Sequence, residues 1–454
     1  MKFTSCNIDP MYFKESKIID NLYLLPCSLV NREIMYSPLR GTAFMVDSNT
    51  ASHLMSGNSD NSLVEDISQK LSPINYELLQ HVDISVKEIS QNLVILLSNS
   101  CNLGCKYCYA QYEREQGFLS RKKIENIINF AFRLNENSSD IVSISFLGGG
   151  EPTLNWDLLV WAIEYAKQQA EVYGIKLRIG FPTNATLLNA EKIDFLVKNN
   201  IEVGVSFELI PEIQNEQRPF ANSNLSSYNI VKRNVYLLNE KGIQTRFRST
   251  ITPQYVHRMQ DMVKNVVAEF PFIKKIHFEP VYPLLESETD SFDIELFYEQ
   301  FIDNFMCARL IGDSYNLVVT TAATNTLGKI KPRYCRGELC ITPKGDLVIC
   351  HRSSSEKDVR YNKFRYGTVS DKCVEVDDIR FQKVNELLNK KAVQCNECFS
   401  KWHCSGMCLS NREMYTTQQF QAYCSYIKKI QPRYIEYMIQ KGGVINESSR
   451  NFCE

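Results

Sequence analysis

The sequence predicts an α/β protein built on a partial (β/α)6 barrel of the TIM type, with a small α+β extension before it and a cysteine-rich domain after it. Two observations carry this prediction. Six apolar runs rich in β-branched residues alternate with helical patterns between residues 91 and 310, and many of the sixteen cysteines gather between residues 335 and 424. Strands that alternate with helices form parallel βα units. Six such units leave the barrel open, because a closed barrel of this type needs eight.

The bulk composition is that of an ordinary globular chain. Its 454 residues are 44% hydrophobic and 23% charged, and the formal net charge is −1. This balance gives no reason to expect nucleic acid or an anionic membrane as a partner. No apolar run approaches the roughly 20 residues of a membrane span, and residues 1–16 lack the apolar centre of a signal peptide. We therefore expect a cytoplasmic protein whose cysteines bind metal rather than form disulfides.

Residues 1–90 form the predicted extension. A first strand is followed by a turn that contains Asn31, and Pro38 and Gly41 interrupt the second strand. The predicted elements are strands at 21–29 and 33–46 and helical pieces at 63–67 and 76–82. Proline and glycine punctuate local structure in this way.

The barrel is predicted to span residues 91–310. Its strands are expected at 93–97, 141–147, 175–181, 201–207, 243–251 and 273–278. Apolar residues at helical spacing predict helices around 124–134, 159–166 and 256–267. Asn189 is a predicted N-cap, and Lys241-Gly242 a predicted helix end. Ligand contacts should gather at the carboxyl ends of the strands, where βα sheets place their sites.

Three cysteines follow the first predicted strand directly. Cys101, Cys105 and Cys108 form a C-x3-C-x2-C array on a short loop. Thiolates are soft ligands suited to iron–sulfur clusters. Three of them can hold three irons of a four-iron cluster and leave the fourth iron open to a small molecule. The alternatives are a zinc site, which more often uses two C-x2-C pairs or Cys/His sets, and three unrelated thiols.

This array, with the aromatic residue Tyr107 before its last cysteine, resembles the radical S-adenosylmethionine family. The resemblance implies that the open iron is chelated by the amino and carboxylate groups of S-adenosylmethionine. A glycine-rich segment that ends in Glu-Pro holds the amino group in that family. It is matched after the second strand by Gly149, Gly150, Glu151 and Pro152. Glycines also let backbone approach a ligand closely, although a tight strand-to-helix turn would use the same residues.

Further cofactor contacts are expected at the next strand ends. Thr183 and Asn184 resemble the family's Thr-Asn pair. Ser206 begins a run in which the family often has Ser-x-Asp-Gly against the ribose, but here Glu208 replaces the Asp and the Gly is missing. This departure puts the ribose contact in doubt.

The fifth and sixth strands end in charged residues. Arg248 is the candidate to pair with the cofactor carboxylate, the alternative being a surface arginine. His277 and Glu279 are candidates to line a substrate cavity, and Glu279 is a candidate catalytic residue.

A connection at 311–334 carries one strand-like piece, 317–321, and leads to the second cysteine array at 335–430. That array resembles the SPASM domain of radical S-adenosylmethionine maturases. The resemblance implies a first auxiliary cluster on Cys335, Cys340, Cys350 and Cys408 and a second on Cys395, Cys398, Cys404 and Cys424. The alternative is a module with two zinc ions. Residues 431–454 are predicted to be a C-terminal helix, interrupted near Pro432, and a tail; the role of Cys373 is left open.

The two resemblances together imply three four-iron clusters, one that binds S-adenosylmethionine and two auxiliary. They also imply a 5′-deoxyadenosyl radical that removes a hydrogen atom from the substrate. The leading hypothesis is a maturase that acts on a ribosomally made precursor peptide and oxidatively installs a thioether or carbon–carbon crosslink. Its electron donor would be a protein such as flavodoxin or ferredoxin. The extension would then recognise a leader peptide, or merely pack against the rest of the chain.

Three alternatives remain. A sulfatase-maturase-like enzyme would make formylglycine, but that subfamily has an Asp base where this chain has His351, and about 100 residues precede Cys101 here. His351 could act as a base itself or be a structural imidazole. A small-molecule dehydrogenase of the same superfamily and a zinc-rich binding module without enzymatic activity complete the set.

Overall fold

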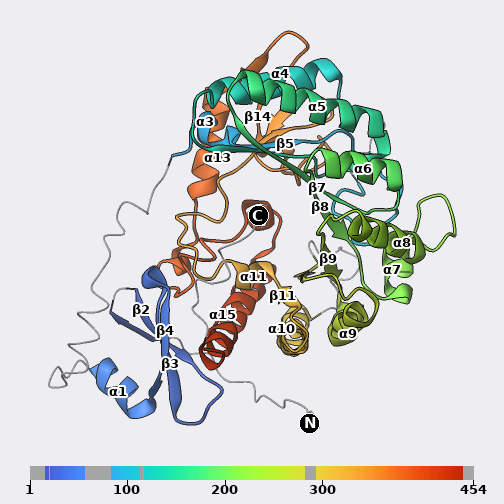
Figure 1. The fold of residues 1–454 in the computed structure, drawn as a ribbon. Coiled ribbons are helices and arrows are strands. Elements are labelled where there is room, and N and C mark those ends of the chain that lie inside the picture. Colours follow the sequence, from blue (N-terminus) through green and yellow to red (C-terminus); the bar gives the residue numbers. More distant parts are fainter. Residues whose placement is uncertain are drawn as a thin grey trace.

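The computed structural model of the 454-residue chain describes residues 16–19, 21–56, 83–112, 114, 117–281 and 293–442. These residues form two sheets (Figure 1). One has four antiparallel strands near the amino terminus. The other has eleven strands in the order β11-β10-β9-β8-β7-β6-β5-β12-β13-β14-β15. None of the described helices has a stretch long and apolar enough to cross a bilayer.

The six predicted barrel strands are confirmed, and they run parallel in sequence order. Their bounds are β5 Asn92–Ile95, β6 Ile141–Ser145, β7 Lys176–Thr183, β8 Glu202–Ser206, β9 Arg246–Ile251 and β10 Lys275–Pro280. The strand-like piece of the predicted connection is β11, Val318–Thr320, which pairs in parallel with β10. The barrel sheet therefore gains a further parallel strand at its open edge.

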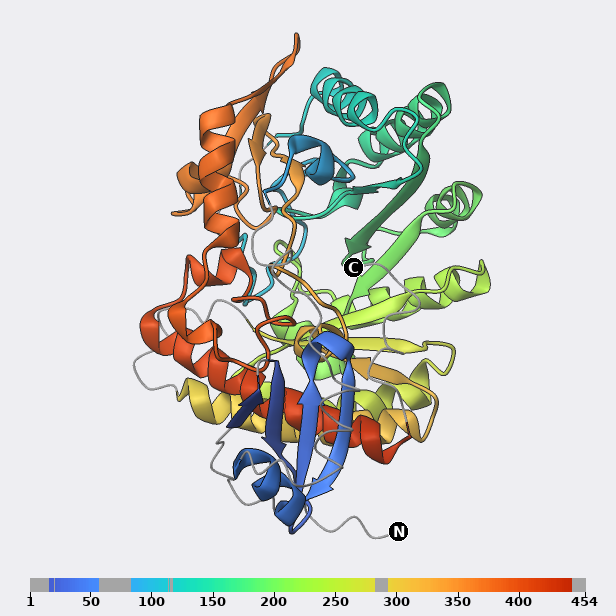
Figure 2. The ribbon, with the colours of Figure 1, turned by 90° about the vertical axis from the view of Figure 1, so that its left-hand side faces the viewer.

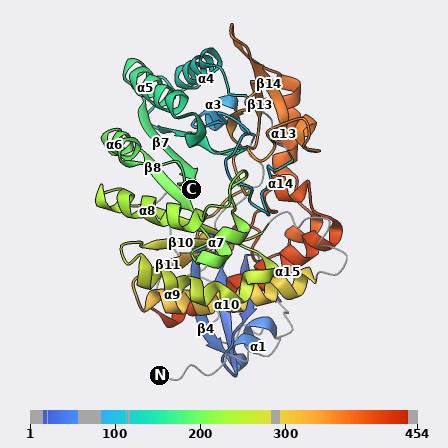
Figure 3. The same cartoon turned by 90° about the vertical axis from the view of Figure 1, so that its right-hand side faces the viewer.

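Helices cover the outer face of this curved sheet (Figures 1 and 3). They are α3 Val86–Ser90, α4 Arg121–Leu134, α5 Trp156–Val172, α6 Ala190–Lys198, α7 Pro211–Gln217, α8 Ser227–Glu240, α9 Met259–Glu269 and α10 Ile294–Asp313. The predicted cap is confirmed, since Asn189 accepts a hydrogen bond from Lys192 N over 2.9 Å. Gly242, with φ of 84°, follows α8 as predicted. Apolar side chains of these helices and of the outward strand positions share one core.

The cysteine-rich domain continues the barrel sheet. Its strand β12, Leu339–Ile341, pairs in parallel with β5, and Cys340 lies opposite Val94. The sheet then turns antiparallel through β13 Asp346–Val348, β14 Arg365–Val369 and β15 Val374–Val376. The remaining short elements are α11 Ala322–Asn325, α12 Tyr361–Phe364, α13 Asp378–Asn389 and α14 Leu409–Arg412. Cys340, one of the predicted auxiliary ligands, is thereby fixed one strand away from the strand that leads to Cys101.

The amino-terminal sheet differs from its prediction. The predicted strand 33–46 is two strands, β3 Arg32–Ser37 and β4 Thr42–Asp47, because the chain reverses at the 3-10 turn Pro38–Arg40 and at Gly41, whose φ is 60°. Strand β2 is Leu22–Pro26, and a further strand, β1 Ser16–Ile19, pairs with it; α1, Ser48–Ser56, follows β4. Asn31 lies in the predicted turn with φ of 56°. The helical pieces expected at 63–67 and 76–82 lie outside the described residues.

This sheet packs on the cysteine-rich domain and on α15 (Figure 2). Trp402 Nε1 donates to Asn21 Oδ1 over 2.7 Å. The hydroxyl of Tyr36 is hydrogen-bonded to Nε2 of the buried His403. Both partners in the cysteine-rich domain lie between Cys398 and Cys404. The extension therefore stabilises the loop that carries the second group of cysteines.

Helix α15 runs without interruption from Thr417 to Gln440, so the predicted break near Pro432 is wrong. A capping box between Thr416 and Gln419 starts the helix. Proline removes one backbone hydrogen bond and costs about 3 kcal/mol in a helix interior. Residues on both sides of it are buried, among them Tyr426, Ile430 and Ile435, and this packing offsets the loss. The helix also begins before residue 431, where its prediction starts, and therefore includes Cys424.

Candidate active site

The loop that carries the first three cysteines follows β5 and is fixed by a second loop. Leu103 forms an isolated antiparallel bridge with Phe220. Gly104 N donates to Pro219 O over 2.8 Å, and Lys106 N to Gln217 O over 3.0 Å. The segment after α7 thus acts as a brace that holds Cys101, Cys105 and Cys108 at the carboxyl end of the barrel sheet.

Two of these three thiols are buried so deeply that a nearby positive charge is needed to stabilise their thiolate forms. Burial raises the pKa of Cys101, and it raises the pKa of Cys105 to about 12. A bound metal cluster would supply the positive charge that keeps such thiols as thiolates. The donor set therefore fits the iron–sulfur group that the spacing predicts.

The glycine segment packs against the residues just ahead of Cys101. Gly150 N donates to Ser98 O over 3.1 Å. A Cβ at Gly149 would lie 2.1 Å from Asn99 Oδ1, and one at Gly150 would lie 1.8 Å from Ser100 O. Only glycine fits at either position. Asn99 Oδ1 is buried with no hydrogen-bond partner among the described residues. This oxygen, which lies beside the glycine segment, is therefore a candidate acceptor for the amino group of a ligand.

Glu151 organises the adjacent strand end. Its carboxylate is 5% exposed and accepts from Thr153 Oγ1 and Thr183 Oγ1, each over 2.6 Å, and from Asn184 N over 2.8 Å. Burial raises the pKa of this carboxyl. Asn184 Nδ2 in turn lies 3.9 Å from Cys101 Sγ. The residues expected to hold the amino group and those of the Thr-Asn pair thus form one network beside the first cysteine; Pro152 follows it and starts a 3-10 turn.

Glu208 has a different environment from the one the resemblance implies. It is fully buried, and its carboxylate accepts from Arg218 Nε over 2.7 Å, Ser249 Oγ over 2.5 Å and the Tyr107 hydroxyl. Its oxygens are therefore occupied by protein donors, whereas Ser206 ends β8 half-buried. Arg218 was not among the predicted site residues. It lies in the brace segment directly after α7, next to Pro219, and no local pattern in the sequence marks it.

Charged residues of β9 and β10 share the inner face of the sheet. His277 Nε2 lies 2.9 Å from Glu279 Oε2, and its Nδ1 lies 3.2 Å from Thr320 Oγ1 of β11. Ala322 N also donates to Glu279. Burial lowers the pKa of His277. Burial raises the pKa of Glu279, but the bond from His277 and the charge of Arg248 bring it below its usual value.

The eight remaining cysteines of the predicted site gather as two groups. Burial raises the pKa of Cys350, and the charges of Glu338 and Cys408 raise it further. The Cys408 charge also raises the pKa of Cys335, whose residue is exposed. The pKa of Cys340 is raised by burial, with a contribution from Cys350. The thiols that influence one another's pKa in this way are the four predicted to hold the first auxiliary cluster, so these four residues lie close together. Beside them, Arg333 is 5% exposed, and its Nε and Nη1 have no hydrogen-bond partner among the described residues.

The second group is assembled in the same way. The pKa of Cys404 is raised by burial and then by Cys398, Cys424 and Cys395. Burial raises the pKa of Cys424 to about 11, and the charge of Cys395 adds to the rise. Cys424 reaches this group from helix α15, and the other three come from the loop between α13 and α14.

Cys350 also belongs to a set of three possible metal ligands. Its thiol, a Glu338 carboxylate oxygen and a ring nitrogen of His351 lie within 4.8 Å of one another. An iron–sulfur cluster binds one thiolate per iron, whereas tetrahedral zinc gathers its thiolates on a single ion at Zn–S distances of about 2.3 Å.

His351 lies between the two cysteine-bearing regions. Its Nδ1 is 2.9 Å from both oxygens of Glu338, a residue that sequence reasoning missed. A Cβ at Gly148 would lie 3.1 Å from Cβ of His351. The glycine segment of the barrel therefore touches the residue that follows Cys350.

Arg352 connects these regions further. The charges of Cys408, Cys350 and Glu279 favour its protonated form and keep its pKa above the ordinary value despite burial. Its guanidinium lies 6.0 Å from the ring centroid of Tyr109, which follows Cys108. Arg352 thus stands near the first cysteine loop, the first auxiliary group and the inner face of the barrel.

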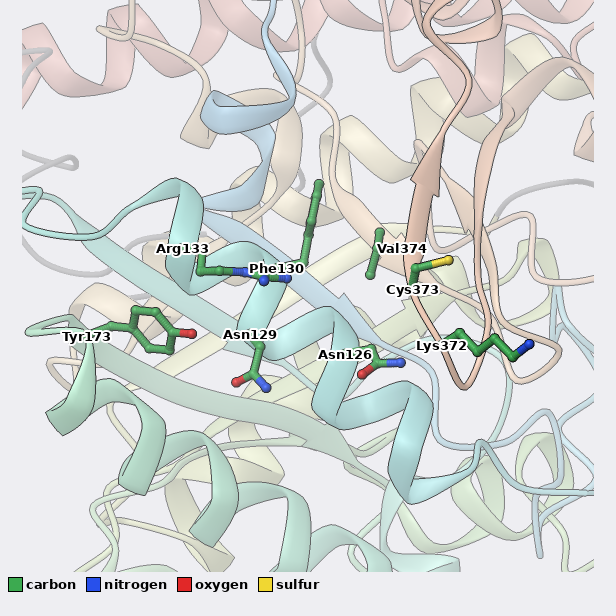
Figure 4. A pocket seen from close by; sticks show the side chains of 8 residues that line it. All are labelled: Asn126, Asn129, Phe130, Arg133, Tyr173, Lys372, Cys373 and Val374. Atoms are coloured by element: carbon green, nitrogen blue, oxygen red, sulfur yellow. The ribbon is translucent and has the colours of Figure 1, made fainter.

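A pocket of about 370 Å³ lies elsewhere, between α4 and the β14–β15 turn (Figure 4). Tyr173, one of its lining residues, precedes β7 and so marks the amino end of the barrel strands, opposite the site. Cys373 also lines it, with Sγ 3.2 Å from Glu375 Oε1. Cys373 is therefore separate from both cysteine groups.

A parallel half-barrel with three thiols after its first strand, a glycine segment beside them and further thiol groups in an attached domain defines a class of cluster-binding α/β enzymes. The family model that matches is the Radical SAM superfamily, over residues 95–266. Residues 95–266 of the chain thus carry a radical SAM domain, and the chain is similar to maturases that contain such a domain. This domain implies S-adenosylmethionine and a four-iron cluster.

Several known proteins are similar to this chain. The radical SAM cyclopropyl synthase TigE of Paramaledivibacter caminithermalis is 23% identical over 349 residues, which cover 72% of this chain and 69% of TigE. A serine-type anaerobic sulfatase-maturating enzyme of Bacteroides thetaiotaomicron is 21% identical, covering 69% of this chain and 80% of that protein. An uncharacterized protein of Methanocaldococcus jannaschii is 28% identical over 42% of this chain, and the match spans 63% of that protein.

The fold is also found in a solved structure. The structure of anSMEcpe with bound AdoMet and the Cp18Cys peptide is 20% identical, with a TM-score of 0.62, covering 77% of this chain and 99% of that one. At this identity the likeness concerns the fold alone.

Proposed function

We propose that this enzyme is a peptide maturase that uses S-adenosylmethionine and three four-iron clusters to install an intramolecular thioether or carbon–carbon crosslink in a ribosomally made precursor peptide. The observation that carries the proposal is the contact between Gly148 and His351. His351 follows Cys350, so this contact supports a location of the predicted first auxiliary cluster close to the segment that would hold the cofactor. A substrate radical formed in the barrel would therefore arise close to a group able to take its electron.

The proposed role of each residue follows from its place in the site. Cys101, Cys105 and Cys108 would hold the first cluster, and Glu151, with Asn99 and the glycine segment, would hold the amino end of S-adenosylmethionine. When bound, these cofactors supply a 5′-deoxyadenosyl radical that removes a hydrogen atom from a substrate carbon. Arg248, exposed on the inner face of β9, is the proposed partner of the cofactor carboxylate.

Crosslinking then requires the loss of one proton and one electron from the substrate. Glu279 is the proposed base, because its lowered pKa keeps the carboxylate ionised and ready to accept a proton, and because His277 fixes its orientation. His351 is the alternative base, but its Nδ1 is already engaged by Glu338. The thiols of the two auxiliary groups would hold the clusters that receive the electron. Similarity to a cyclopropyl synthase and a sulfatase-maturating enzyme supports oxidative chemistry at a carbon atom.

The test uses anaerobically reconstituted full-length protein, dithionite, S-adenosylmethionine and synthetic peptides encoded by the short reading frames that flank its gene. The expected result, measured by mass spectrometry, is a peptide that has lost two hydrogen atoms. One 5′-deoxyadenosine should form per product, and no fragment ions should arise from backbone cleavage between the two linked residues. Deoxyadenosine without any peptide product, for every such peptide, would contradict the proposal. A flavodoxin or a ferredoxin should replace dithionite.

Formylglycine formation is the second candidate, favoured by the similarity to the sulfatase-maturating enzyme. It would give a peptide aldehyde that reacts with a hydrazide probe, whereas a crosslinked peptide would not react. The same reaction mixture therefore distinguishes the two products.

A further inference from the structure

A buried charge pair stands behind the first cysteine loop. Arg218 is 8% exposed and Glu208 is fully buried, and Arg218 Nε donates to Glu208 Oε1 over 2.7 Å. The same carboxylate accepts from the Tyr107 hydroxyl, Ser249 Oγ and Thr250 N. Burying a charge is costly unless it is paired and hydrogen-bonded. Four donors from three separate segments meet that need, so the Glu208 carboxylate is held in a fixed position.

The two charges act on the cysteine loop unequally. Arg218 Nη1 lies 4.0 Å from Cys105 Sγ, and its guanidinium lies 5.3 Å from the ring centroid of Tyr107. Glu208 approaches the loop through the hydroxyl of Tyr107. The cation is thus the nearer of the two charges to the thiol.

We propose that Arg218 and Glu208 are positioning residues that set the reduction potential of the first cluster, Arg218 raising it and Glu208 lowering it. The reduced cluster carries one more negative charge than the oxidised one, so a fixed cation nearby favours reduction and a fixed anion opposes it. Such charges act strongly in a low-dielectric interior, and cluster potentials depend on net charge and on hydrogen bonds to sulfur. The proposal rests on ligation of this cluster by Cys101, Cys105 and Cys108, and it is independent of the peptide substrate.

The proposal also gives Glu208 a role other than a ribose contact. The carboxylate that aligns with the family's Asp is turned toward protein donors. It is therefore expected to act on the cofactor site through Arg218 and the cluster, without touching S-adenosylmethionine.

The test measures the midpoint potential of the reconstituted full-length enzyme by a redox titration followed by electron paramagnetic resonance. The signal to follow is the one that changes when S-adenosylmethionine is added, because only the cluster with an open iron binds it. We expect Arg218→Gln to lower the potential and Glu208→Gln to raise it, whereas Arg218→Lys, which keeps the charge, stays near the parent. Deoxyadenosine formation by Arg218→Gln should fall about tenfold with dithionite and recover with a stronger reductant.

Ser249→Ala is the matched control, because it removes a hydrogen bond to Glu208 and leaves both charges in place. A purely structural role would move Arg218→Gln and Glu208→Gln in the same direction, or leave both potentials unchanged, and either result would overturn the proposal. So would weaker S-adenosylmethionine binding by Glu208→Gln at an unchanged potential. Iron per chain is measured for every variant. If Arg218→Gln does not load iron, the Glu208→Gln potential decides: a rise supports the proposal and no rise refutes it.

Discussion

Glu279 combines a place on the inner face of the barrel with a depressed pKa and an oriented hydrogen bond from His277. Glu279 also interacts electrostatically with Arg248 and Arg352. These features suit a carboxylate that accepts a proton from the substrate after hydrogen-atom removal. They do not bear on the cleavage of S-adenosylmethionine, which precedes that step.

Glu279→Gln should therefore uncouple the two halves of the reaction. Deoxyadenosine should still form, while peptide product falls by about a hundredfold, the typical contribution of a general base. The measurement is product per deoxyadenosine by chromatography and mass spectrometry. Glu202→Gln is the control, since Glu202 is paired with Arg178 near the amino ends of the strands. Equal losses of deoxyadenosine and product in Glu279→Gln would contradict the assignment.

The pH profile of the same ratio should respond to His277. The folded pKa of Glu279 lies below its ordinary value because His277 donates to it, so the base stays ionised as the pH falls. His277→Phe removes that donor, and the pKa of Glu279 should rise. The acid limb of product per deoxyadenosine is then expected to move to higher pH. An unchanged limb would mean that another group is the base.

Gly150 is tightly enclosed, because a Cβ there would lie 1.8 Å from Ser100 O. Gly150→Ala should displace the segment before Cys101 and reduce both iron loading and S-adenosylmethionine binding. Gly204→Ala is the control: its Cβ would meet no atom nearer than 3.9 Å, and alanine is better than glycine within a strand. Normal iron content in Gly150→Ala would show that the close contact is not needed.

At the scale of elements, the amino-terminal sheet has a structural task that can be tested. The Tyr36 hydroxyl and His403 are joined in the interior, and Tyr36 is fully buried. The predicted role in leader-peptide recognition remains a prediction. The contact between this sheet and the cysteine-rich domain, by contrast, is the hydrogen bond between the Tyr36 hydroxyl and His403 Nε2.

Tyr36→Phe leaves His403 Nε2 buried without that partner, at a cost of about 1–3 kcal/mol. Amide hydrogen exchange in β2–β4 and in the loop around Cys398 should become faster, measured by mass spectrometry. Tyr112→Phe is the control, because Tyr112 is 69% exposed. Faster exchange confined to the sheet, with the cysteine loop unaffected, would mean that the extension does not stabilise that loop.

At the scale of the whole molecule, β12 makes the barrel and the cysteine-rich domain one sheet. This continuity fixes the distance between the first cysteine loop and the first auxiliary group. The second group is held by the amino-terminal sheet and α15. The three cysteine groups are therefore positioned by different parts of the fold.

Replacing Cys395 and Cys398 by alanine should remove one auxiliary cluster without affecting the first. The iron content is expected to fall from about twelve to about eight per chain. Deoxyadenosine should persist and peptide product should be lost. Iron and acid-labile sulfide analysis checks the first expectation, and Cys373→Ala is the control that should retain all the iron. Unchanged product in the double variant would exclude an auxiliary role for this cluster.

Local sequence determined much of this protein. Alternating apolar runs predicted the barrel strands, because β-branched segments and helical spacing are local signals. The C-x3-C-x2-C and Gly-Gly-Glu-Pro patterns predicted the first site, because their ligands are close together in the chain. Local rules failed at Pro432, where burial of α15 outweighs a missing hydrogen bond, and at 33–46, where a chain reversal looked like an interrupted strand.

Tertiary structure alone decided the long-range pairs. The contacts of Gly148 with His351 and of Glu208 with Ser249, and the pairing of Cys340 with Val94, join residues that no sequence pattern links. The brace that places Arg218 against Cys105 depends on a bridge between Leu103 and Phe220. Such contacts form only when distant segments pack together. For this reason the sequence predicted which residues would bind cofactors, and the fold decided which charges lie beside them.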